Sequence, residues 1–516
     1  MSGYTFEPFP PTPLVRRGPS RRVAVLGAGL AGLCAADLLT QAGHEVVVLE
    51  ARSRPGGRVL TLREGFSPGL HADAGAAFVP GGHPLTVGYI NQLGLELDPL
   101  PVDAGSEMDF VQGALIKNPG DAKAAWPVAL HPDEQGKTLM ELMIRYLGGP
   151  LQDVAAQDPR SPGWPPPALE KYDAVTFCQL LAQQGASPGA VTLLHLGFPD
   201  FWGDGAFAAS ALLILRDDAF MMAMAAETTP TTPVGHPASR RYRHHAHLAR
   251  LTAANPPPLN PLATYRIRGG TDGLPNAMAA QLAGRIRFDA PVIAIHQRPD
   301  GVEIECGNGV GTIAADRVIS TIPWSVLKDI PITPALPAPK AAAISELPYT
   351  SVTRVFLEFS SRYWQPQGSN GNASTDLPET GPENHPGVWI EDATAAQDTS
   401  LGILDCYYTG APARDVGALG ESDRARVALD AVERVWPGAR SHYTGQAMSV
   451  CWDEDPWALG DYCWFRPGQM RRLCPVIPRP EGRLHFAGDH TSSLPGWMQG
   501  AFESGIRAAQ EVNAAG

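Results

Sequence analysis

The segment Val23-Ala-Val-Leu-Gly27-Ala-Gly29-Leu-Ala-Gly32 decides the fold of this chain. Its apolar start, Val23–Leu26, predicts a short buried strand, and the helical spacing of Leu33–Ala42, which ends at Gly43, predicts a helix. Glu45-Val-Val-Val-Leu-Glu50 predicts a second buried strand. The three elements form a strand–helix–strand unit with G-x-G-x-x-G in the first turn and an acidic residue after the second strand.

Each glycine of this turn has a separate physical task. Gly27 permits the tight turn, Gly29 lets the backbone approach a pyrophosphate, and Gly32 lets the helix pack closely on the strand. The helix N-terminus offers free N–H groups to phosphates. Glu50, 23 residues after Gly27, lies where a carboxylate accepts hydrogen bonds from ribose hydroxyls. The pattern predicts a dinucleotide site, the alternative being a glycine-rich turn without a ligand.

The next residues extend this site. Glu50-Ala51-Arg52 leads into the turn Gly56-Gly57-Arg58, which can offer N–H groups and a guanidinium to a second phosphate. This stretch resembles the extended flavin fingerprint of the FAD-dependent amine oxidase superfamily, which contains monoamine, polyamine and L-amino acid oxidases. The alternative is a basic surface turn. The resemblance further places Gly75, Ala76 and Val292 against FAD.

A second motif of the same family lies at the other end of the chain. Phe486-Ala-Gly488-Asp489-His-Thr491, followed by Gly496-Trp497-Met498-Gln-Gly-Ala501, resembles its C-terminal FAD motif. The resemblance implies that Asp489 binds the ribityl chain of the flavin. It also implies that a helix beginning near Trp497 points its positive end at the N1–C2=O region of the isoalloxazine ring. The C-terminal residues expected to contact FAD are Gly488, Asp489, Gly496, Trp497, Met498 and Ala501.

Two aromatic residues are expected to form the walls of a substrate cage. By resemblance Tyr462 lies on one wall and Trp497 on the other, with Trp464 and Gly496 beside them. The alternative is that these aromatic residues belong to the core. Some family members attach flavin covalently through a cysteine just before this tyrosine. Asp461 stands there, so non-covalent FAD is expected, although Cys463 lies close in sequence.

Arg354 is the third residue that bears on the substrate. The segment Leu347–Leu357 resembles a family strand that usually carries a lysine, and Arg354 stands in its place. Many L-amino acid oxidases have a carboxylate-binding arginine where Phe78 falls. A buried carboxylate needs a compensating cation. We therefore expect Arg354 to bind the substrate carboxylate, unless it turns to solvent. Gly270–Met278 also resembles the L-amino acid oxidase branch.

The resemblance implies oxidative deamination of an L-amino acid, large and apolar or aromatic, to the 2-oxo acid, ammonia and hydrogen peroxide. Arg354, Tyr462 and Trp497 are the expected catalytic residues, and Phe78 is expected to contact the substrate. A monoamine or polyamine oxidase is the nearest alternative. A flavin desaturase or isomerase, and a flavoprotein without catalytic activity, are more distant alternatives.

The amino-acid composition limits which classes of binding partner and which cell compartment are expected. The chain has 516 residues, of which 44% are hydrophobic, so a large core is possible. Its net charge of −13 argues against nucleic acid. Seven scattered cysteines without C-x-x-C predict neither disulfides nor a metal site and favour a reducing, cytoplasmic location, with a removed export signal left open. No apolar run long enough to cross a membrane is present. The expected partners are an amino acid or amine and molecular oxygen, with a homodimer left open.

The expected fold is α/β with α+β elements: a Rossmann-type FAD-binding domain, a mixed-sheet substrate domain and a helical domain. Residues 367–386 are expected to form a polar loop. The basic run 240–250 is expected to form a solvated loop or helix, the alternatives being metal binding and a role in substrate attraction or subunit contact. The segment 198–202 is expected to line a substrate funnel or to pack in the core. The expected boundaries are 1–20 for an N-terminal extension; 21–74, 263–337 and 480–516 for the FAD-binding domain; 75–130 and 338–479 for the substrate-binding domain; and 131–262 for the helical domain.

Overall fold

A parallel sheet holds the glycine-rich turn. The computed structural model describes residues 8–16, 18–101, 106–111, 113–118, 125–161, 163–196, 203–226, 263–375 and 388–515. All neighbouring strands of this five-stranded sheet are parallel, and its order is β10-β2-β1-β14-β21. The strands are β1 (Arg22–Leu26), β2 (Glu45–Leu49), β10 (Ile286–Arg287), β14 (Arg317–Ser320) and β21 (Leu484–Phe486). Residues from both ends and from the middle of the chain therefore build one sheet.

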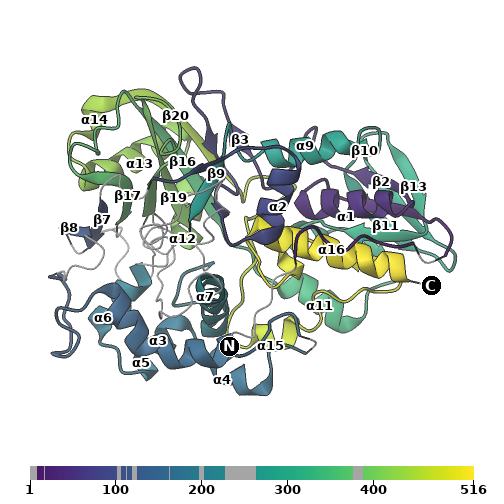
Figure 1. Ribbon diagram of the computed structural model, residues 1–516, viewed down its shortest axis with the longest axis horizontal. Coiled ribbons are helices and arrows are strands. Elements are labelled where there is room, and N and C mark those ends of the chain that lie inside the picture. Colours follow the sequence, from purple (N-terminus) through teal and green to yellow (C-terminus); the bar gives the residue numbers. More distant parts are fainter. Residues whose placement is uncertain are drawn as a thin grey trace, which may run out of the picture.

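Two helices from opposite ends of the chain lie side by side against this sheet (Figure 1). They are α1 (Leu30–Gln41) and α16 (Met498–Ala514). Gly505 permits their close approach, because a Cβ atom there would lie 2.5 Å from the Ala31 carbonyl oxygen. The predicted strand–helix–strand unit is present, and its helix begins at Leu30, directly after the second glycine.

Smaller elements surround the parallel sheet. A four-stranded sheet has the order β13-β12-β11-β15, a three-stranded sheet the order β5-β9-β6, and β3 pairs with β4. The strands are β3 (Thr61–Leu62), β4 (Ala72–Asp73), β5 (Val79–Pro80), β6 (Leu97–Pro99), β9 (Thr264–Ile267), β11 (Val292–Gln297), β12 (Val302–Cys306), β13 (Gly311–Ala315) and β15 (Ile332–Thr333). The helices are α2 (Pro84–Gln92), α9 (Gly273–Gln281), α10 (Trp324–Leu327), α11 (Ala338–Glu346), α15 (Gln469–Leu473) and the 3₁₀ turn η4 (Asp489–Thr491).

A seven-stranded mixed sheet forms a second body, in the order β20-β16-β19-β18-β17-β7-β8. Its strands are β7 (Ser106–Val111), β8 (Ala114–Asn118), β16 (Val352–Phe359), β17 (Ser369–Thr375), β18 (Val388–Asp392), β19 (Gly402–Thr409) and β20 (Tyr443–Cys451). One face is apolar and packs in a common core with α13. The helices beside this sheet are α12 (Gly410–Gly417), α13 (Glu421–Val435) and α14 (Ala439–His442).

The other face of this sheet carries side chains that line the cavity described in the next subsection. Arg354 on β16 is opposite Tyr407 on β19, which is opposite Trp389 on β18. Directly paired residues in a sheet share a face, so these three side chains form one row. In the next row on the same face, Asp405 is opposite Glu391.

Strand β17 contradicts the loop expected over residues 367–386. Its sequence, SNGNAST, has poor strand propensity, yet all seven residues are buried between β18 and β7. The pairing partners are distant in the sequence, so tertiary contacts override the local preference. Residues 376–386 of the predicted loop lie outside the described residues, as do the segments 198–202 and 240–250.

Helices form the third body, drawn in blue in Figure 1. Capping boxes start two of them: Thr138 with Glu141, and Thr176 with Gln179. The helix expected over residues 206–215 begins five residues later and ends at Ala226. The elements are α3 (Leu139–Ala155), η1 (Pro167–Leu169), α4 (Glu170–Asp173), α5 (Phe177–Gln183), α6 (Pro188–Leu196) and α7 (Ala211–Ala226).

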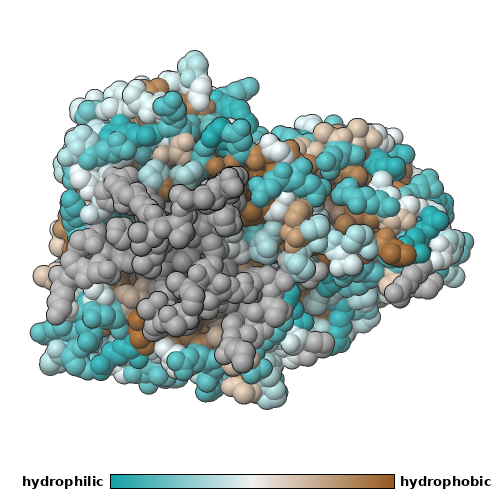
Figure 2. All heavy atoms as spheres, in the orientation of Figure 1, coloured by the Kyte–Doolittle hydropathy of each residue, from teal (hydrophilic) through white to brown (hydrophobic). Residues whose placement is uncertain are grey.

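The predicted combination of α/β and α+β elements is confirmed by these sheets and helices. The domain boundaries stay predictions. Within the described ranges, no helix is both long and apolar enough to cross a membrane. All seven cysteines lie in described segments, and each has a free thiol. Teal, hydrophilic residues predominate over the described surface that Figure 2 presents.

Candidate active site

One cavity joins the parallel sheet to the seven-stranded sheet. Its empty space is about 1850 Å³, a volume that includes open solvent at its mouth. Residues from both glycine-rich motifs line it, and so do residues of β16, β18, β19 and α7. The two glycine-rich motifs and the seven-stranded sheet therefore face one common cavity.

The N-terminal turn forms a cradle at one end of the cavity. Gly27 has a φ of +106°, a conformation that favours glycine. Nothing lies within 4 Å of the position that a Cβ of Gly29 would occupy. Glu50 accepts hydrogen bonds from the N–H groups of Ala28 (2.7 Å) and Arg52 (2.9 Å), so its carboxylate is fixed. Since a carboxylate has about four acceptor sites, Glu50 can also accept bonds from a ribose.

Gly32 has the packing role expected of it and does not line the cavity. A Cβ there would lie 2.0 Å from the carbonyl oxygen of Gly27. The helix can therefore start directly behind the turn only because residue 32 has no side chain. Its N-terminal N–H groups point at the place where a phosphate would bind.

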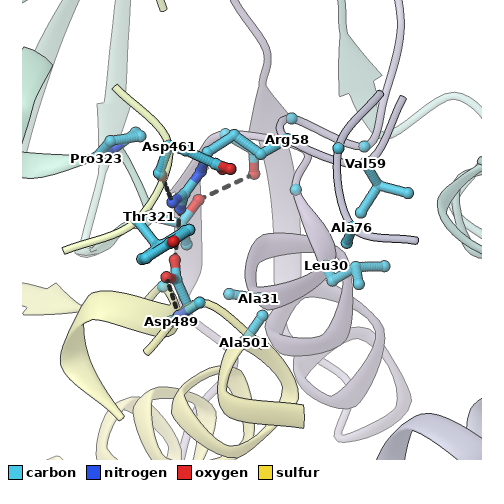
Figure 3. A pocket seen from close by; sticks show the side chains of 18 of the residues that line it. Leu30, Ala31, Arg58, Val59, Ala76, Thr321, Pro323, Asp461, Asp489 and Ala501 are labelled. Atoms are coloured by element: carbon cyan, nitrogen blue, oxygen red, sulfur yellow. Dashed lines mark hydrogen bonds and ion pairs between the residues drawn. The ribbon is translucent and has the colours of Figure 1, made fainter. Parts of the chain in front are cut away.

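Arg58 connects the two motifs. Its guanidinium lies between Asp461 and Asp489 on one side of the cavity (Figure 3). It donates to the Asp489 carboxylate at 2.5 Å and to the backbone carbonyl of Asp461. The Gly496 N–H also donates to Asp489, at 2.9 Å. Burial would raise the pKa of Asp489, but Arg58 and the other contacts outweigh it and hold that pKa below its ordinary value.

The N-terminus of α16 is held in place by α2. The Gln499 side-chain oxygen accepts hydrogen bonds from the N–H groups of Leu85 (3.0 Å) and Thr86 (3.2 Å), which would otherwise lack partners at the start of α2. His83 packs edge-on against Trp497, with ring centroids 5.1 Å apart. Burial lowers the pKa of His83 to about 3, so it is a neutral support for the indole.

Aromatic side chains form the wall of the cavity on the seven-stranded sheet. Trp389 lies between Phe78 and Tyr407, at centroid distances of 5.9 Å and 6.2 Å. Tyr407 shares a side-chain hydrogen bond with Tyr462. Tyr462 in turn packs on Gly496, where a Cβ would approach its ring to 3.3 Å. These contacts give the chamber rigid apolar walls.

Arg354 lines the cavity, and its guanidinium is already bound to carboxylates. Nε donates to Asp405 at 2.9 Å, and Nη2 donates to Asp405 and, at 3.3 Å, to Glu391. Nη1 donates to the carbonyl oxygen of Gly75 at 2.7 Å. Of its five N–H groups, one on Nη1 is not used by these bonds. The residue is only 4% exposed, so it does not turn to solvent.

This arginine belongs to a larger buried network. Arg266 lies 3.0 Å from Glu391 and 3.9 Å from Asp73, and it covers the ring of Phe78 at 4.9 Å. Burial raises the pKa of Asp405 to about 6, although Arg354 opposes the shift. The network therefore places two arginines against three carboxylates, and Arg354 is the member that reaches the cavity.

Most residues predicted for the site come together here. Every expected FAD contact lines the cavity except Gly32, and so do Arg354, Phe78, Tyr462 and Trp497. Trp464 does not: it is buried against Gly203 in the core, where a Cβ of that glycine would lie 2.2 Å from its ring. Sequence reasoning did not assign to the chamber several residues that line it: Leu213, Asp217, Trp389, Tyr407, Trp457, Asp461 and Cys463. Within the described ranges no cluster of three or more metal-ligating side chains occurs.

Comparison with known proteins agrees with this arrangement. The family model for flavin-containing amine oxidoreductases matches residues 30–513. The chain belongs to this family. An L-amino-acid oxidase of Vipera ammodytes ammodytes is 28% identical over 510 residues, which cover 96% of this chain and 93% of that protein. A protein of Bacillus subtilis (strain 168), provisionally named L-amino-acid oxidase YobN, is 31% identical over 509 residues, with coverages of 96% and 95%.

Solved structures of amine oxidases share the fold of this flavin-containing amine oxidoreductase. Putrescine oxidase bound to putrescine gives a TM-score of 0.75 at 22% identity, over 96% of this chain and 99% of that one. Cyclohexylamine oxidase from Brevibacterium oxydans gives 0.74 at the same identity and coverages. The predicted resemblance to the amine oxidase superfamily is confirmed, and with it the use of a flavin cofactor.

Proposed function

We propose that this flavin-containing amine oxidoreductase is an FAD-dependent oxidase that deaminates an L-amino acid. The observation that carries the proposal is the single cavity that joins the dinucleotide cradle to an aromatic chamber. The names of the relatives from Vipera and Bacillus support an amino acid as substrate. The overall reaction consumes the amino acid, O₂ and water and releases the 2-oxo acid, ammonia and hydrogen peroxide.

The residues present fit FAD. Glu50 would hold the ribose, the start of α1 and Arg58 the diphosphate, Asp489 the ribityl chain, and the start of α16 the pyrimidine end of the flavin ring. When bound, FAD accepts the hydride from the substrate α-carbon and passes the electrons to oxygen. The chain itself positions the amine between Tyr462 and Trp497 and excludes water with its aromatic walls.

The chamber favours a large apolar or aromatic side chain. Phe78, Trp389 and Tyr407 present adjacent apolar surfaces to the cavity. Burying an apolar substrate group against them gains about 25 cal/mol per Å². In this proposal the unused N–H on Nη1 of Arg354 binds the substrate carboxylate, and the guanidinium charge offsets its burial.

A second candidate is an amine without a carboxylate, and the contacts of Arg354 favour it. Asp405 and Glu391 already neutralise that guanidinium, so a third carboxylate in this region faces a less favourable potential. Phe78 stands where a carboxylate-binding arginine is expected in many amino acid oxidases. Under this candidate function the enzyme is a monoamine or polyamine oxidase.

A substrate screen decides between the candidates. The purified FAD-loaded enzyme is given each L-amino acid and its decarboxylated amine in matched pairs, and hydrogen peroxide is measured. We expect release with L-phenylalanine, L-leucine or a similar amino acid, and little with the matching amine. Release with the amines alone establishes the second candidate. Absence of flavin bleaching by every amine under anaerobic conditions contradicts both.

The cage walls are expected to control the chemical step. Replacing Trp497 with alanine removes one wall and the indole that His83 supports, so kcat/KM for the best substrate falls by about 10²-fold. Tyr462→Phe keeps the wall and loses the phenol hydroxyl with its hydrogen bond to Tyr407, so the loss is about tenfold or less. Stopped-flow reduction of the flavin measures both. Equal losses would mean that the hydroxyl, and not the wall, matters.

FAD is expected to be held without a covalent bond. The residue before Tyr462 is Asp461, and Cys463 is 2% exposed with a thiol pKa that burial raises well above its ordinary value. A protonated thiol is a poor nucleophile. Acid or heat denaturation should therefore release all of the flavin into the supernatant, which absorbance at 450 nm measures. Flavin that stays with the precipitated protein contradicts this prediction.

A further inference from the structure

Asp461 is a carboxylate that the flavin-binding motifs do not explain. It lines the cavity directly before the cage residue Tyr462. Its backbone is fixed on both sides, because its N–H donates to the carbonyl of Thr350 at 2.9 Å and its own carbonyl accepts from Arg58. The carboxylate forms no hydrogen bond or ion pair with any side chain in the described part of the protein. Its side chain therefore faces the cavity without a bonded cation.

The neighbours of Asp461 place it along the flavin ring system. Arg58 bridges its backbone to Asp489, which the C-terminal motif places at the ribityl chain (Figure 3). The following residue, Tyr462, packs on Gly496 at the start of the loop that leads into α16. Residue 461 thus lies between the ribityl end and the substrate end of the proposed FAD site. This inference rests on the proposed function to the extent that FAD occupies this cavity.

We propose that Asp461 sets the reduction potential of the bound flavin. Two-electron reduction adds negative charge to the ring system, which the start of α16 stabilises. A carboxylate beside the ring has the opposite effect, because like charges in a partly buried site repel more strongly than in water. Asp461 lowers the potential and so favours transfer of the two electrons onward to oxygen.

The surrounding charges do not cancel this effect by direct pairing. Arg58 and Arg354 attract the Asp461 carboxylate, whereas Asp489 and Asp453 repel it. Arg58 is committed to Asp489, and Arg354 is committed to Asp405 and Glu391. Burial raises the pKa of Asp461 to about 6, which agrees with a carboxylate that lacks a close cation and leaves it mostly ionised above neutral pH.

The test is the midpoint potential of the FAD-loaded enzyme, measured at pH 8 by equilibration with a reference dye. Asp461→Asn keeps the shape of the side chain and leaves the Arg58 bond to the backbone carbonyl intact. We expect a more positive potential in this variant and in Asp461→Ser, and a potential close to the original in Asp461→Glu. The Ser variant provides a second neutral side chain if the Asn variant does not fold.

Asp455→Asn is the matched control. Asp455 also loses one negative charge in this change, but it pairs with Arg52 at 2.7 Å, beside Glu50 at the ribose end of the cradle. The midpoint potential of the flavin in this variant should equal that of the unmodified enzyme. An unchanged or more negative potential in the neutral Asp461 variants overturns the inference, and so does an equal shift in Asp455→Asn. Purified protein that binds no FAD contradicts the proposed function itself, which absorbance shows before any titration.

Discussion

Replacement of Arg354 by methionine is expected to lower the free energy of unfolding by about 3–5 kcal/mol, because it leaves a buried carboxylate without its cation. Asp405 is fully buried, and Arg354 provides its ion pair and its hydrogen bonds. Glu391 keeps a compensating cation, because Arg266 still lies 3.0 Å from its carboxylate. Urea unfolding of the FAD-loaded protein, followed by circular dichroism, measures the change.

A second substitution identifies the cause. Asp405→Asn in the Arg354→Met background removes the uncompensated charge, so most of the lost stability should return. Arg22→Met serves as the surface control, because the Arg22 and Asp316 side chains are 52% and 31% exposed and surface ion pairs contribute about 0–1 kcal/mol. If the double variant is as unstable as the single variant, the loss reflects packing and not charge.

The same position tests the substrate carboxylate. Arg354→Lys keeps one positive charge but cannot make the bidentate contact with Asp405 or reach the cavity with a second N–H. If Arg354 binds the carboxylate, KM rises far more for amino acids than for their decarboxylated amines. If Arg354 only supports Gly75 and the sheet, both KM values change by the same factor.

The second large effect is expected at Gly32. A Cβ at this position would lie 2.0 Å from the Gly27 carbonyl oxygen, and this neighbour is backbone that cannot rotate away. Gly32→Ala should therefore separate α1 from β1, cost more than about 3 kcal/mol of stability and abolish FAD binding. Thermal unfolding and the flavin content of the purified protein measure the two losses.

Gly29→Ala provides the contrast. Nothing lies within 4 Å of its Cβ position, which is open to the cavity, so the apoprotein should keep its stability. The added methyl group stands where the backbone must approach a phosphate, and we expect FAD affinity to fall by at least about tenfold. Gly148→Ala, in the open middle of α3, is the control for the substitution itself: it should leave FAD affinity unchanged and, because alanine favours a helix interior, raise stability by about 1 kcal/mol at most. Tight FAD binding by Gly29→Ala would contradict the proposed position of the phosphate.

The two ends of the chain could be interpreted from sequence because their signals are local. The turn from Gly27 to Gly32 and the acidic residue at position 50 fall within one strand–helix–strand unit. The positions of Trp389 and Tyr407 in the cavity wall could not be predicted from a local motif. They become neighbours of Arg354 only through the register of β16, β18 and β19, which no short motif encodes.

Arg354 shows that the ion-pair partners of a buried charge cannot be predicted from local sequence. Its position on a strand and its chemistry could be predicted, but its partner Asp405 is 51 residues away along the chain. Whether a buried cation is available to a ligand depends on such partners. Trp464 shows the same limit for packing, since the family resemblance that placed it beside the cage could not reveal that its ring fills the space beside Gly203.

The mixed origin of the parallel sheet also has a consequence for biosynthesis. Strand β21 completes the sheet beside β14, and the cavity needs residues 488–501 for its second half. A ribosome that has synthesised the first 480 residues has therefore produced Gly27, Gly29 and Glu50 of the cradle but not Asp489 or α16. If the proposed FAD site is right, the flavin cannot be enclosed before residues 488–501 have been made, and we expect a protein truncated before residue 488 to bind no FAD.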